Sequence, residues 1–589
     1  MKNLLSDATR ARLRHLLPLL AGQKRALTIG FLLLVATNAS AAAIPYLMKL
    51  ATEDLLNRTP LDLHLLVLVG LALTNAFFRI HSRTRIFGIG RDVEFALRAR
   101  YHAKLLSLDL PFLEKEKTGD LAARAAADVS AVRMFVGPGF LQISNVIMAY
   151  AATLPVMLGL DPLLTILTLA PIPIVMGVSR LLTRRMYRLS RVVADRFGAL
   201  SGFIQESIAG YAAIHAHARE ADWNRRFAQE TDELSQAALR HARLQSLFGP
   251  MVLLAGATGG FIILAHGGSR VAAGQLTMGD FIAFSGYLAM LIWPTVGFGW
   301  ILTVMQRGLA ALDRISGVLD AQPFLAPDLA HALPDPERWQ GAIRIENLDF
   351  AFKPGLPVLR DLSIDIPAGG LTGLAGRIGC GKSALLQLLA RLYPVPEGHV
   401  FIDGHDLALI PEAELRRELA MVPQESFLFS APLIDNLLLD RSDPGHERAR
   451  RAIHLTALDE EVDRFPKGID TLIGERGITL SGGQRQRAAL ARALIGDPAI
   501  LLLDDVFSHV DARTEERILD AIRAESRVRT VILVCHRVAA LKKADRIFLL
   551  DQGEVVATGD HAALLVSSSL YRDLHDTMSR AEALEALAR

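Results

Sequence analysis

Residues 376–383 read GRIGCGKS, the stretch on which the organisation of the chain depends, and they fit the phosphate-binding pattern GxxxxGK[ST]. An apolar segment at 370–375 precedes them and another follows at 384–389, so the glycines lie where a buried strand turns into a helix. Backbone N–H groups and a helix N-terminus in such a turn bind phosphate, which makes a chance glycine turn the lesser alternative. In this interpretation Lys382 reaches the β- and γ-phosphates of a nucleotide, and the Ser383 hydroxyl binds Mg²⁺.

The composition of the chain changes along its length. A chain of 589 residues predicts more than one domain. Basic and acidic residues nearly balance, 64 against 62, so the net charge gives no indication of a nucleic-acid partner. Before about residue 310, long uncharged runs alternate with arginine-rich ones, and after about residue 340 the pattern is that of a soluble α/β protein. The two cysteines, Cys380 and Cys535, indicate a reducing compartment rather than a disulfide framework.

Six stretches of the first half are apolar enough to cross a bilayer, which takes about 20 residues of helix. They run over residues 26–50, 63–78, 139–160, 163–182, 251–266 and 281–305. One such run is compatible with a buried core helix, but six are not compatible with one globular core. The sequence therefore predicts an all-α transmembrane domain of six helices.

The positions of the basic residues predict the orientation of these spans. Arginines and lysines crowd the segment after the second span, from 83 to 133, and the segment around the end of the fourth, from 180 to 196. The other three connections hold only Arg58 and Arg270. Because basic residues favour the cytosolic side, we expect a multi-pass protein of the plasma (inner) membrane with both termini and residues 376–383 in the cytosol. No charged residue lies in the middle of a span, which favours a largely apolar translocation path without a proton or ion relay.

Two basic segments keep helical periodicity beyond the expected membrane boundary. Residues 91–108 and 189–216 alternate in charge as helices that continue out of the bilayer would. Turns at 117–119 and near Gly210 offer short surfaces on which a cytosolic domain could dock. Solvated charged helices are the alternative interpretation.

The second half contains strands that end in polar side chains. Residues 343–352 alternate as a half-buried strand, and Phe352 near its end either stacks on a purine or belongs to the core. The run AILLL at 499–503 suits a strand buried on both faces, which delivers Asp504 to the edge of the sheet beside residues 376–383, where it would hold Mg²⁺ through water. Residues 530–535 form a further strand that ends in His536.

Residues 480–484 read LSGGQ and are followed by RQR. Together with GRIGCGKS, Gln424 in MVPQ, LLLDD, Asp511 in SHVD and His536, they resemble the nucleotide-binding domain of an ABC transporter over about residues 341–575. The first half resembles the six-helix exporter type, including multidrug-resistance-like half-transporters. The resemblance implies an all-α six-helix transmembrane domain fused to an α/β P-loop nucleotide-binding domain, an ABC ATPase. Its ATP hydrolysis would be coupled to transport.

The resemblance also assigns residues to ATP and Mg²⁺. It implies that nucleotide is bound by Phe352, Gly376, Arg377, Ile378, Gly379, Cys380, Gly381, Lys382, Ser383, Ala384, Leu480, Ser481, Gly482, Gly483, Gln484 and Asp511. It implies that Ser383, Gln424 and Asp504 are the Mg²⁺ ligands and that Asp505, His536 and Gln424 are catalytic. In these roles Phe352 stacks on adenine, Gln424 also couples to the membrane helices, and His536 contacts the γ-phosphate.

One position departs from the family pattern. The family places glutamate after the strand-terminal aspartate as general base, and here that residue is Asp505. An aspartate is one methylene shorter, and a misplacement of about 1 Å can cost roughly 100-fold in rate. In the family each ATP lies between the P-loop of one subunit and the LSGGQ signature of the other. The resemblance therefore implies a second half-transporter as partner, with this chain as the subunit of a heterodimer whose own site hydrolyses ATP poorly.

The implied function is ATP-driven export or flipping of a hydrophobic small molecule, lipid or peptide. A homodimer that tolerates Asp505 is the alternative, since a shortened carboxylate can work through a bridging water. An importer of exporter-like shape and a non-transporting ATP-binding regulator are the other two.

The expected domain organisation is as follows. Residues 1–23 form an amphipathic elbow, 24–315 the transmembrane domain, 316–340 a linker, 341–575 the nucleotide-binding domain and 576–589 a helical tail.

Overall fold

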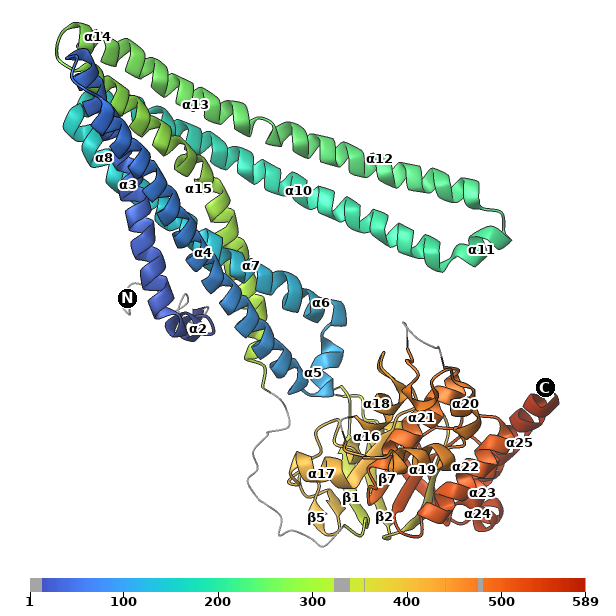
Figure 1. The fold of residues 1–589 in the computed structure, drawn as a ribbon. Coiled ribbons are helices and arrows are strands. Elements are labelled where there is room, and N and C mark those ends of the chain that lie inside the picture. The colour runs from blue at the N-terminus through green and yellow to red at the C-terminus, as the bar shows by residue number, and fades with distance from the viewer. Residues whose placement is uncertain (1–12, 323–338, 354, 440, 475–479, 588–589) are drawn as a thin grey trace. The chain divides into compact units, whose positions relative to one another are not determined.

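The structure is a computed structural model, and it describes residues 13–322, 339–353, 355–439, 441–474 and 480–587 (Figure 1). The chain divides into two compact units, each of which is described by itself. The helical unit contains Met1–Ser107 and Glu116–Ala321, and the α/β unit contains Leu108–Lys115 and Gln322–Arg589.

Long helices make up the helical unit, as the apolar runs predict. In chain order the unit contains α2 (Leu17–Gly22), α3 (Lys24–Leu56), α4 (Asp62–Leu106), α6 (Thr118–Ala123), η1 (Arg124–Asp128), α7 (Val129–Met134), η2 (Phe135–Gly139), α8 (Phe140–Leu160), α9 (Pro162–Leu169), α10 (Pro171–Ala209), α11 (Tyr211–Ala216), α12 (Glu220–Gln245), α13 (Phe248–Ile262), η3 (Ile263–Gly267), α14 (Gly268–Ala272) and α15 (Met278–Leu319). Here η1, η2 and η3 are π-helical turns within otherwise continuous helices.

Most of the expected membrane spans fall in helices suited to crossing a bilayer. Four helical stretches are long and apolar enough, and they contain the expected spans 26–50, 63–78, 139–160 and 251–266: Lys24–Leu56, Asp62–Leu106, Thr118–Leu160 and Glu220–Ala272. The spans expected at 163–182 and 281–305 coincide with shorter apolar helices among the described residues, Pro162–Ile174 and Met278–Ile292. The first of these is broken at Ala170, because Pro171 cannot donate a backbone hydrogen bond and begins a new helix.

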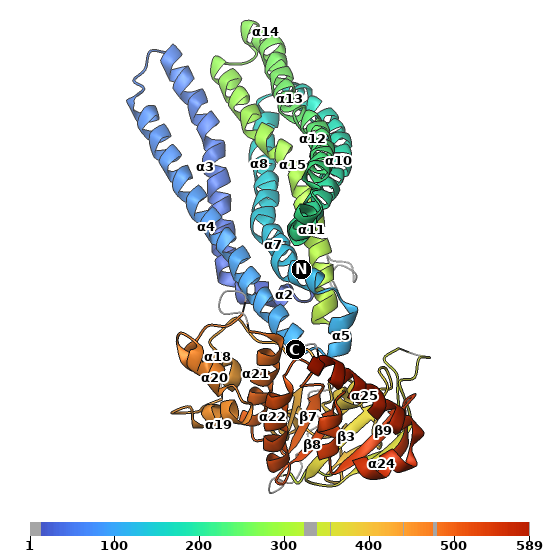
Figure 2. The ribbon, with the colours of Figure 1, turned by 90° about the vertical axis from the view of Figure 1, so that its right-hand side faces the viewer.

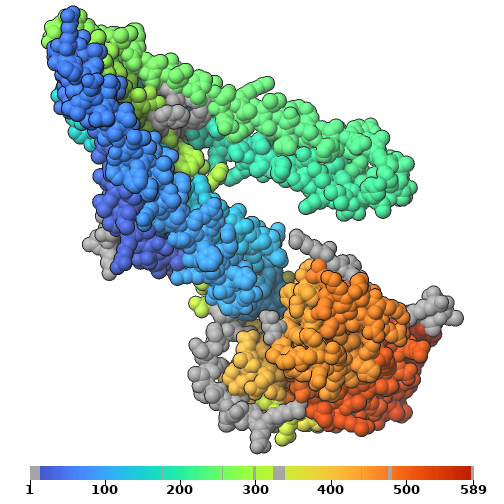
Figure 3. Space-filling model, viewed as in Figure 1, coloured from blue at the N-terminus to red at the C-terminus, as the bar shows by residue number. Residues whose placement is uncertain are grey.

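Two helices continue beyond their apolar parts. α4 runs through its arginine-rich end to Leu106, and α10 runs to Ala209, which confirms the helices expected at 91–108 and 189–216. Gly210 ends α10, and the short α11 completes the second segment. α10 and α12 lie side by side and form, with α11, an arm that extends away from the other helices of the unit (Figures 1 and 3). Near its tip, Trp223 donates a hydrogen bond from Nε1 to Ser207 Oγ at 2.8 Å.

Small residues permit close packing elsewhere in the helical unit. A Cβ atom on Gly90 of α4 would lie 3.2 Å from Gly137 Cα in η2, so these backbones approach too closely for a larger residue. By contrast, leucines such as Leu66 and Leu73 on α4 are largely exposed. An exposed apolar surface of this kind suits contact with lipid.

The α/β unit contains two sheets (Figure 2). Its strands are β1 (Ile343–Phe350), β2 (Leu359–Ile366), β3 (Gly370–Gly376), β4 (Val400–Ile402), β5 (His405–Asp406), β6 (Leu419–Val422), β7 (Ile500–Asp504), β8 (Thr530–Val534), β9 (Arg546–Asp551) and β10 (Glu554–Gly559). The larger sheet has the order β10-β9-β3-β8-β7-β6 and is parallel except for β10, and the smaller is antiparallel in the order β2-β1-β4-β5.

Helices cover both faces of the larger sheet. They are α16 (Lys382–Leu389), α17 (Glu412–Glu418), α18 (Leu433–Leu438), α19 (Glu447–Leu455), α20 (Asp459–Arg464), α21 (Gly482–Ile495), α22 (Ala512–Glu525), α23 (Val538–Lys543), α24 (His561–Ser567) and α25 (Ser569–Leu587), with a short 3₁₀ turn, η4 (Gly468–Asp470). Every residue of β7 and β8 is buried, as the run AILLL predicts for a strand covered on both faces. Leu501 and Leu503 face the core formed with α21 and α22, whereas Ile500 and Leu502 face the core formed with α16 and the smaller sheet.

The ends of the units differ from the expected domain limits. The expected elbow, residues 1–23, contains α2, while residues 1–12 lie outside the described part. α15 continues past residue 315 to Leu319 because Ile315 and Val318 are buried against the other helices. Most of the expected linker, residues 323–338, lies outside the described part of the chain. The expected tail, residues 576–589, falls within α25, whose Tyr571 and Met578 belong to the core of the α/β unit.

Candidate nucleotide-binding site

The loop between β3 and α16 has the backbone that a phosphate-binding loop requires. Gly376 has φ of 152°, and a Cβ atom there would lie 2.2 Å from the carbonyl oxygen of Leu550. Gly381 has φ of 104°, and its Cβ would lie 2.6 Å from Leu359 Cδ2. Any side chain at either position would collide with the sheet, so both glycines are needed for the loop to close above it.

The other loop residues divide into an exposed tip and a buried base. Arg377, Ile378 and Gly379 are exposed, whereas Cys380 and Ala384 are buried. An exposed tip can reach around a ligand, and the buried base fixes the start of α16.

Lys382 is held inside the loop. Its Nζ atom donates hydrogen bonds to the carbonyl oxygens of Gly376 at 2.8 Å and Arg377 at 2.9 Å, and the side chain is only 5% exposed. The ammonium group therefore already points into the ring of backbone atoms that would surround a phosphate. Phosphate oxygens would replace the two carbonyl oxygens as its acceptors.

Asp504 ends β7 beside the start of α16. Ser383 donates a hydrogen bond from Oγ to Asp504 Oδ1 at 3.0 Å, and Asp504 is 4% exposed. Burial raises the pKa of Asp504 and the Asp505 charge adds to the rise, while the Ser383 hydrogen bond, Lys382 and His536 oppose it. A carboxylate that is costly to bury favours a bound cation.

The donor set fits Mg²⁺. This ion prefers oxygen ligands and is usually bound by one or two carboxylates together with nucleotide phosphates and water. Ser383 and Asp504 supply a hydroxyl and a carboxylate next to each other. Gln424, the third expected ligand, is exposed in the loop after β6, at the same end of the sheet.

The parallel register brings the ends of four strands to one edge of the sheet. Asp504 pairs with Val534 and Val422 pairs with Leu503, so Gln424, Asp505 and His536 follow neighbouring strand ends. This is the edge at which parallel α/β sheets bind ligands. His536 is half-buried, and burial and the Lys382 ammonium lower its pKa, with Asp505 and Asp504 acting in the opposite direction. A neutral imidazole is therefore favoured there.

Asp505 has a fixed backbone. Its N–H donates to Val534 O at 2.9 Å, and its φ is 47°. Its carbonyl oxygen accepts from Gln486 Nε2 at 3.4 Å and from Ser508 Oγ at 3.3 Å. The left-handed conformation is one that aspartate adopts more readily than most residues, and the contacts on both sides of the peptide hold it in place.

The signature residues form a capped helix start. Ser481 Oγ accepts from Gln484 N at 3.3 Å, while Ser481 N donates to Gln484 Oε1 at 2.9 Å, a reciprocal capping box at the N-terminus of α21. Leu480 is buried just before it. The N-terminal backbone groups of α21 carry the partial positive charge that suits a phosphate.

The two signature glycines are needed for packing against the segment after β7. A Cβ atom on Gly483 would lie 2.4 Å from His509 O, and one on Gly482 would lie 3.1 Å from the His509 ring. Asp511, two residues on, caps α22 by accepting from Thr514 N at 3.0 Å. Its expected part in nucleotide binding is thus combined with a structural one.

Gln486 is a residue that the sequence reasoning did not select. It is buried in α21, donates from Nε2 to Ser508 Oγ at 2.8 Å and accepts from His509 N at 3.3 Å. Together with its contact to Asp505, it joins the signature helix to the segment that carries Asp505. Its place in RQR directly after the signature is the only sequence signal for it.

An aromatic cluster surrounds the expected adenine-stacking residue. Phe352 follows β1, is 46% exposed, and makes edge contacts with Phe350 and Tyr393 at centroid distances of 5.0 Å each. It can therefore offer one ring face to a base while packing on the others. Tyr393 also donates from its hydroxyl to Glu114 Oε2 at 2.7 Å.

Glu114 belongs to α5 (Leu110–Lys115), a short helix that packs within the α/β unit. Leu110 adds to the core there, and burial raises the pKa of Tyr393, with its hydrogen bond to Glu114 acting in the same direction. The docking surface expected at 117–119 thus lies just upstream, on α5. No sequence pattern distinguished Glu114 or Tyr393 from other polar residues.

Comparison with known proteins agrees with this arrangement. The chain matches the ABC transporter transmembrane region over residues 27–295 and the ABC transporter family over residues 359–508. It is 32% identical over 560 residues to the probable multidrug resistance ABC transporter ATP-binding/permease protein YheI of Bacillus subtilis, covering 93% of this chain and 94% of that protein. It is 31% identical over 549 residues to the ATP-dependent lipid A-core flippase of Nitrosococcus oceani, covering 92% and 90%.

A solved structure shares the fold. The structure of a bacterial Atm1-family ABC exporter with ATP bound aligns with a TM-score of 0.78 and 24% sequence identity, and the match covers 94% of this chain and 98% of that chain. The whole arrangement of helical and α/β units is therefore a known one.

Proposed function

The chain belongs to the ABC transporter family as an exporter-type half-transporter whose ATP hydrolysis is coupled to transport, and on this premise we propose that it is one half of a heterodimeric exporter. In the proposed assembly its own P-loop site holds ATP but hydrolyses it slowly. Its LSGGQ signature completes the competent site on the partner.

The observation that carries this proposal is Asp505. The residue occupies the position at which the resemblance places a glutamate general base, and its carboxylate is one methylene shorter. The hydrogen bonds from Asp505 N to Val534 and from Gln486 to its carbonyl oxygen restrain the backbone. The carboxylate therefore cannot advance to make up the difference, and a shortfall of about 1 Å is expected to cost roughly 100-fold in rate.

The rest of the P-loop site supports ATP binding. Lys382 would donate to the phosphates, and Ser383 and Asp504 would hold Mg²⁺, which shields the phosphate charge when bound. Phe352 would stack on the adenine. The neutral His536 would donate to the γ-phosphate, because an imidazole with a lowered pKa still carries one N–H group.

The signature supports the second part of the proposal. Its capping box and the close packing of Gly482 and Gly483 on His509 leave a helix start whose backbone N–H groups can bind a γ-phosphate. Nothing in this surface departs from the family pattern. A chain with an altered catalytic carboxylate and an unaltered signature fits a subunit that completes its partner's site.

We propose a hydrophobic or amphipathic substrate. The expected spans carry no charged residue near their centres, which favours an apolar path. The relatives named above include a multidrug resistance protein and a lipid A-core flippase, both of which are named for substrates with large apolar parts. The charge distribution places the α/β unit in the cytosol and the helical unit in the plasma (inner) membrane.

Comparing the lone chain with the assembled pair tests the proposal. The chain is purified by itself and together with the half-transporter that co-purifies from its native membrane, and the ATPase activity of each is measured with and without a drug or lipid substrate. We expect substrate-stimulated activity only in the pair. Full stimulated activity in the lone chain would favour the homodimer instead.

Transport direction is tested separately. Inside-out vesicles that contain the pair should accumulate substrate when ATP is added outside, because their cytosolic face is outward. Loss of preloaded substrate under the same conditions would identify an importer, and ATP binding without any flux would identify a regulator.

A further inference from the structure

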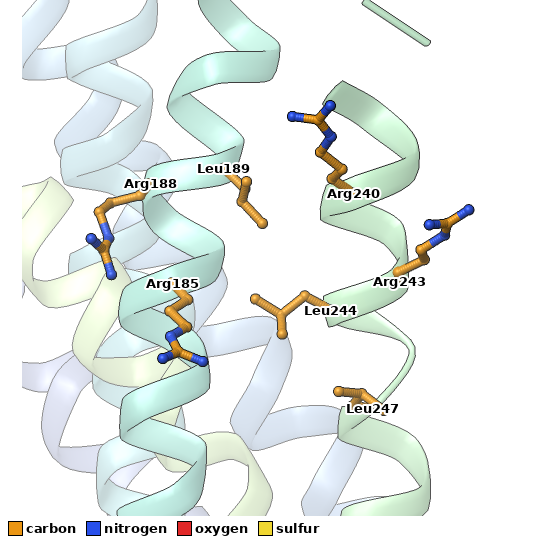
Figure 4. Close-up of a pocket in the computed structure, with 7 residues that line it drawn as sticks. All are labelled: Arg185, Arg188, Leu189, Arg240, Arg243, Leu244 and Leu247. Atoms are coloured by element: carbon orange, nitrogen blue, oxygen red, sulfur yellow. The ribbon is translucent and has the colours of Figure 1, made fainter. Parts of the chain in front are cut away.

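A cleft lies between α10 and α12 in the helical unit, near the base of the arm (Figure 4). Its volume is about 540 Å³, within the range of about 300–1,000 Å³ typical of small-molecule sites. Four arginines line it, two from each helix: Arg185, Arg188, Arg240 and Arg243.

The floor of the cleft is apolar. Leu189 of α10 and Leu244 of α12 point towards each other across the gap, and Leu247 lies beyond them at the start of α13 (Figure 4). Arg185 and Arg240 lie along the gap on opposite helices, and the longer reach of Arg188 and Arg243 extends around its sides. The cleft thus combines a greasy floor with a positively charged rim.

These positive charges are not neutralised by the protein. Within the described part of the chain, none of the four guanidinium groups has a hydrogen-bond or ion-pair partner from another side chain. The sequence has no aspartate or glutamate between Asp161 and Asp195, or between Glu233 and Asp280. Like charges on facing helices repel, so an anion bound between them would stabilise the packing of α10 on α12.

The position along the helices indicates the kind of anion. The span expected at 163–182 ends just before Arg185, and the span expected at 251–266 begins just after Leu247. The cleft therefore lies at the cytosolic boundary of both helices, where arginine binds acidic head groups and leucine contacts acyl chains. Arginine is also suited to phosphate and carboxylate because its planar fork can donate two parallel hydrogen bonds.

We infer that this cleft is a binding site for an amphiphile with an anionic head group, phosphate or carboxylate, and an apolar chain. The head lies among Arg185, Arg188 and Arg240, and the chain lies on the leucines towards the membrane. If the occupant is cargo, the inference deepens the proposed function and rests on it for that role. A lipid of the inner leaflet would use the same chemistry.

Binding is measured on the full-length chain in phosphatidylcholine nanodiscs without nucleotide, so the result does not depend on ATPase activity, transport or the partner subunit. The probe is radiolabelled dodecyl phosphate, and binding to empty nanodiscs is subtracted. We expect saturable binding that inorganic phosphate and dodecyltrimethylammonium displace poorly. Equal displacement by either compound would overturn the inference, since the first lacks the chain and the second lacks the anion.

Matched variants locate the site. The double variant R185Q/R240Q should weaken binding about tenfold, because it removes two charged donors to the head group. R184Q/R225Q removes two exposed arginines from the same helices outside the cleft and should leave binding unchanged. Equal losses in the two variants, or no loss in R185Q/R240Q, would contradict the assignment. Retained ATP binding at Lys382 verifies that each variant is folded.

Two further arms separate the parts and the sources of the ligand. Leu244→Asn should weaken binding of dodecyl phosphate, since it places an amide on the floor, and an unchanged affinity would contradict the predicted chain position. Nanodiscs that contain phosphatidylglycerol should displace the probe if a membrane lipid is the natural occupant. Persistence of the probe there would identify a transported amphiphile, and both results support an anionic amphiphile site.

Discussion

The two sides of the nucleotide chemistry in this chain are preserved to different degrees. On the P-loop side, the residues that hold ATP are in place, but the residue next to Asp504 is an aspartate with a restrained backbone. On the signature side, Ser481 and Gln484 cap each other, and both glycines pack against His509. The difference indicates that binding and cleavage of ATP can be divided between two subunits, because each subunit needs only one complete side.

The largest expected effect comes from the signature side. Ser481→Ala removes a phosphate donor and half of the capping box, and we expect it to lower the ATPase activity of the assembled pair about 100-fold, as loss of one such donor does elsewhere. Ser481→Thr keeps the hydroxyl and should retain most of the activity. If Ser481→Ala retains normal turnover, the signature of this chain does not serve a competent site.

The next effect is on ATP affinity of the P-loop side. Lys382→Ala removes an ammonium group that already points into the loop, and we expect photolabelling of this chain by an azido-ATP analogue to require about 100-fold more nucleotide. ATPase activity of the pair should fall less than in Ser481→Ala, because the competent site keeps its own lysine. An equal or larger fall in activity would reverse the order of the two sides.

A smaller effect is expected where the adenine site meets α5. Tyr393→Phe removes the hydroxyl that donates to Glu114, a bond worth about 1–2 kcal/mol when the acceptor is charged and partly buried. We expect ATP affinity and basal ATPase to stay the same while stimulation by transported substrate decreases, since α5 joins the α/β unit to the end of α4 in sequence. Glu114→Gln keeps an acceptor and should be milder. Reduced ATP affinity would show that Tyr393 supports the base and does not act on coupling.

The smallest effect is expected at Asp505. Asp505→Asn keeps the size and the left-handed backbone, and because the residue is not expected to act as general base, ATPase of the pair should change by less than about twofold. Asp505→Glu should give, if anything, some gain at this site, limited by the poorer fit of glutamate to the positive φ. A large loss in Asp505→Asn would show that the aspartate is catalytic.

Much of the fold could be predicted from local patterns. The fully apolar run at 499–503 predicted a strand covered on both faces, and the glycines of 376–383 predicted a strand-to-helix turn, because each pattern has few alternative structures. The family comparison supports the transporter fold and the ATPase. Where α15 ends could not be predicted, because it is decided by the tertiary burial of Ile315 and Val318.

The candidate site was only partly visible in the sequence. Lys382, Ser383 and Asp504 belong to short motifs whose spacing brings them together. Gln486, Tyr393 and Glu114 were missed because their roles arise from hydrogen bonds between segments distant in sequence, and each residue type is common on any surface. The arginine cleft depends in the same way on the side-by-side packing of α10 and α12.

The nucleotide that remains on this chain after turnover tests the division between the two sides most directly. The assembled pair is incubated with Mg²⁺ and an azido-ATP analogue labelled in the α-phosphate, irradiated, and separated into its two chains, and the nucleotide attached to each is analysed. We predict that the nucleotide on this chain is mainly triphosphate while that on the partner is mainly diphosphate. Equal diphosphate on both chains would contradict the account, because it would show that the site with Asp505 cleaves ATP as readily as its partner's.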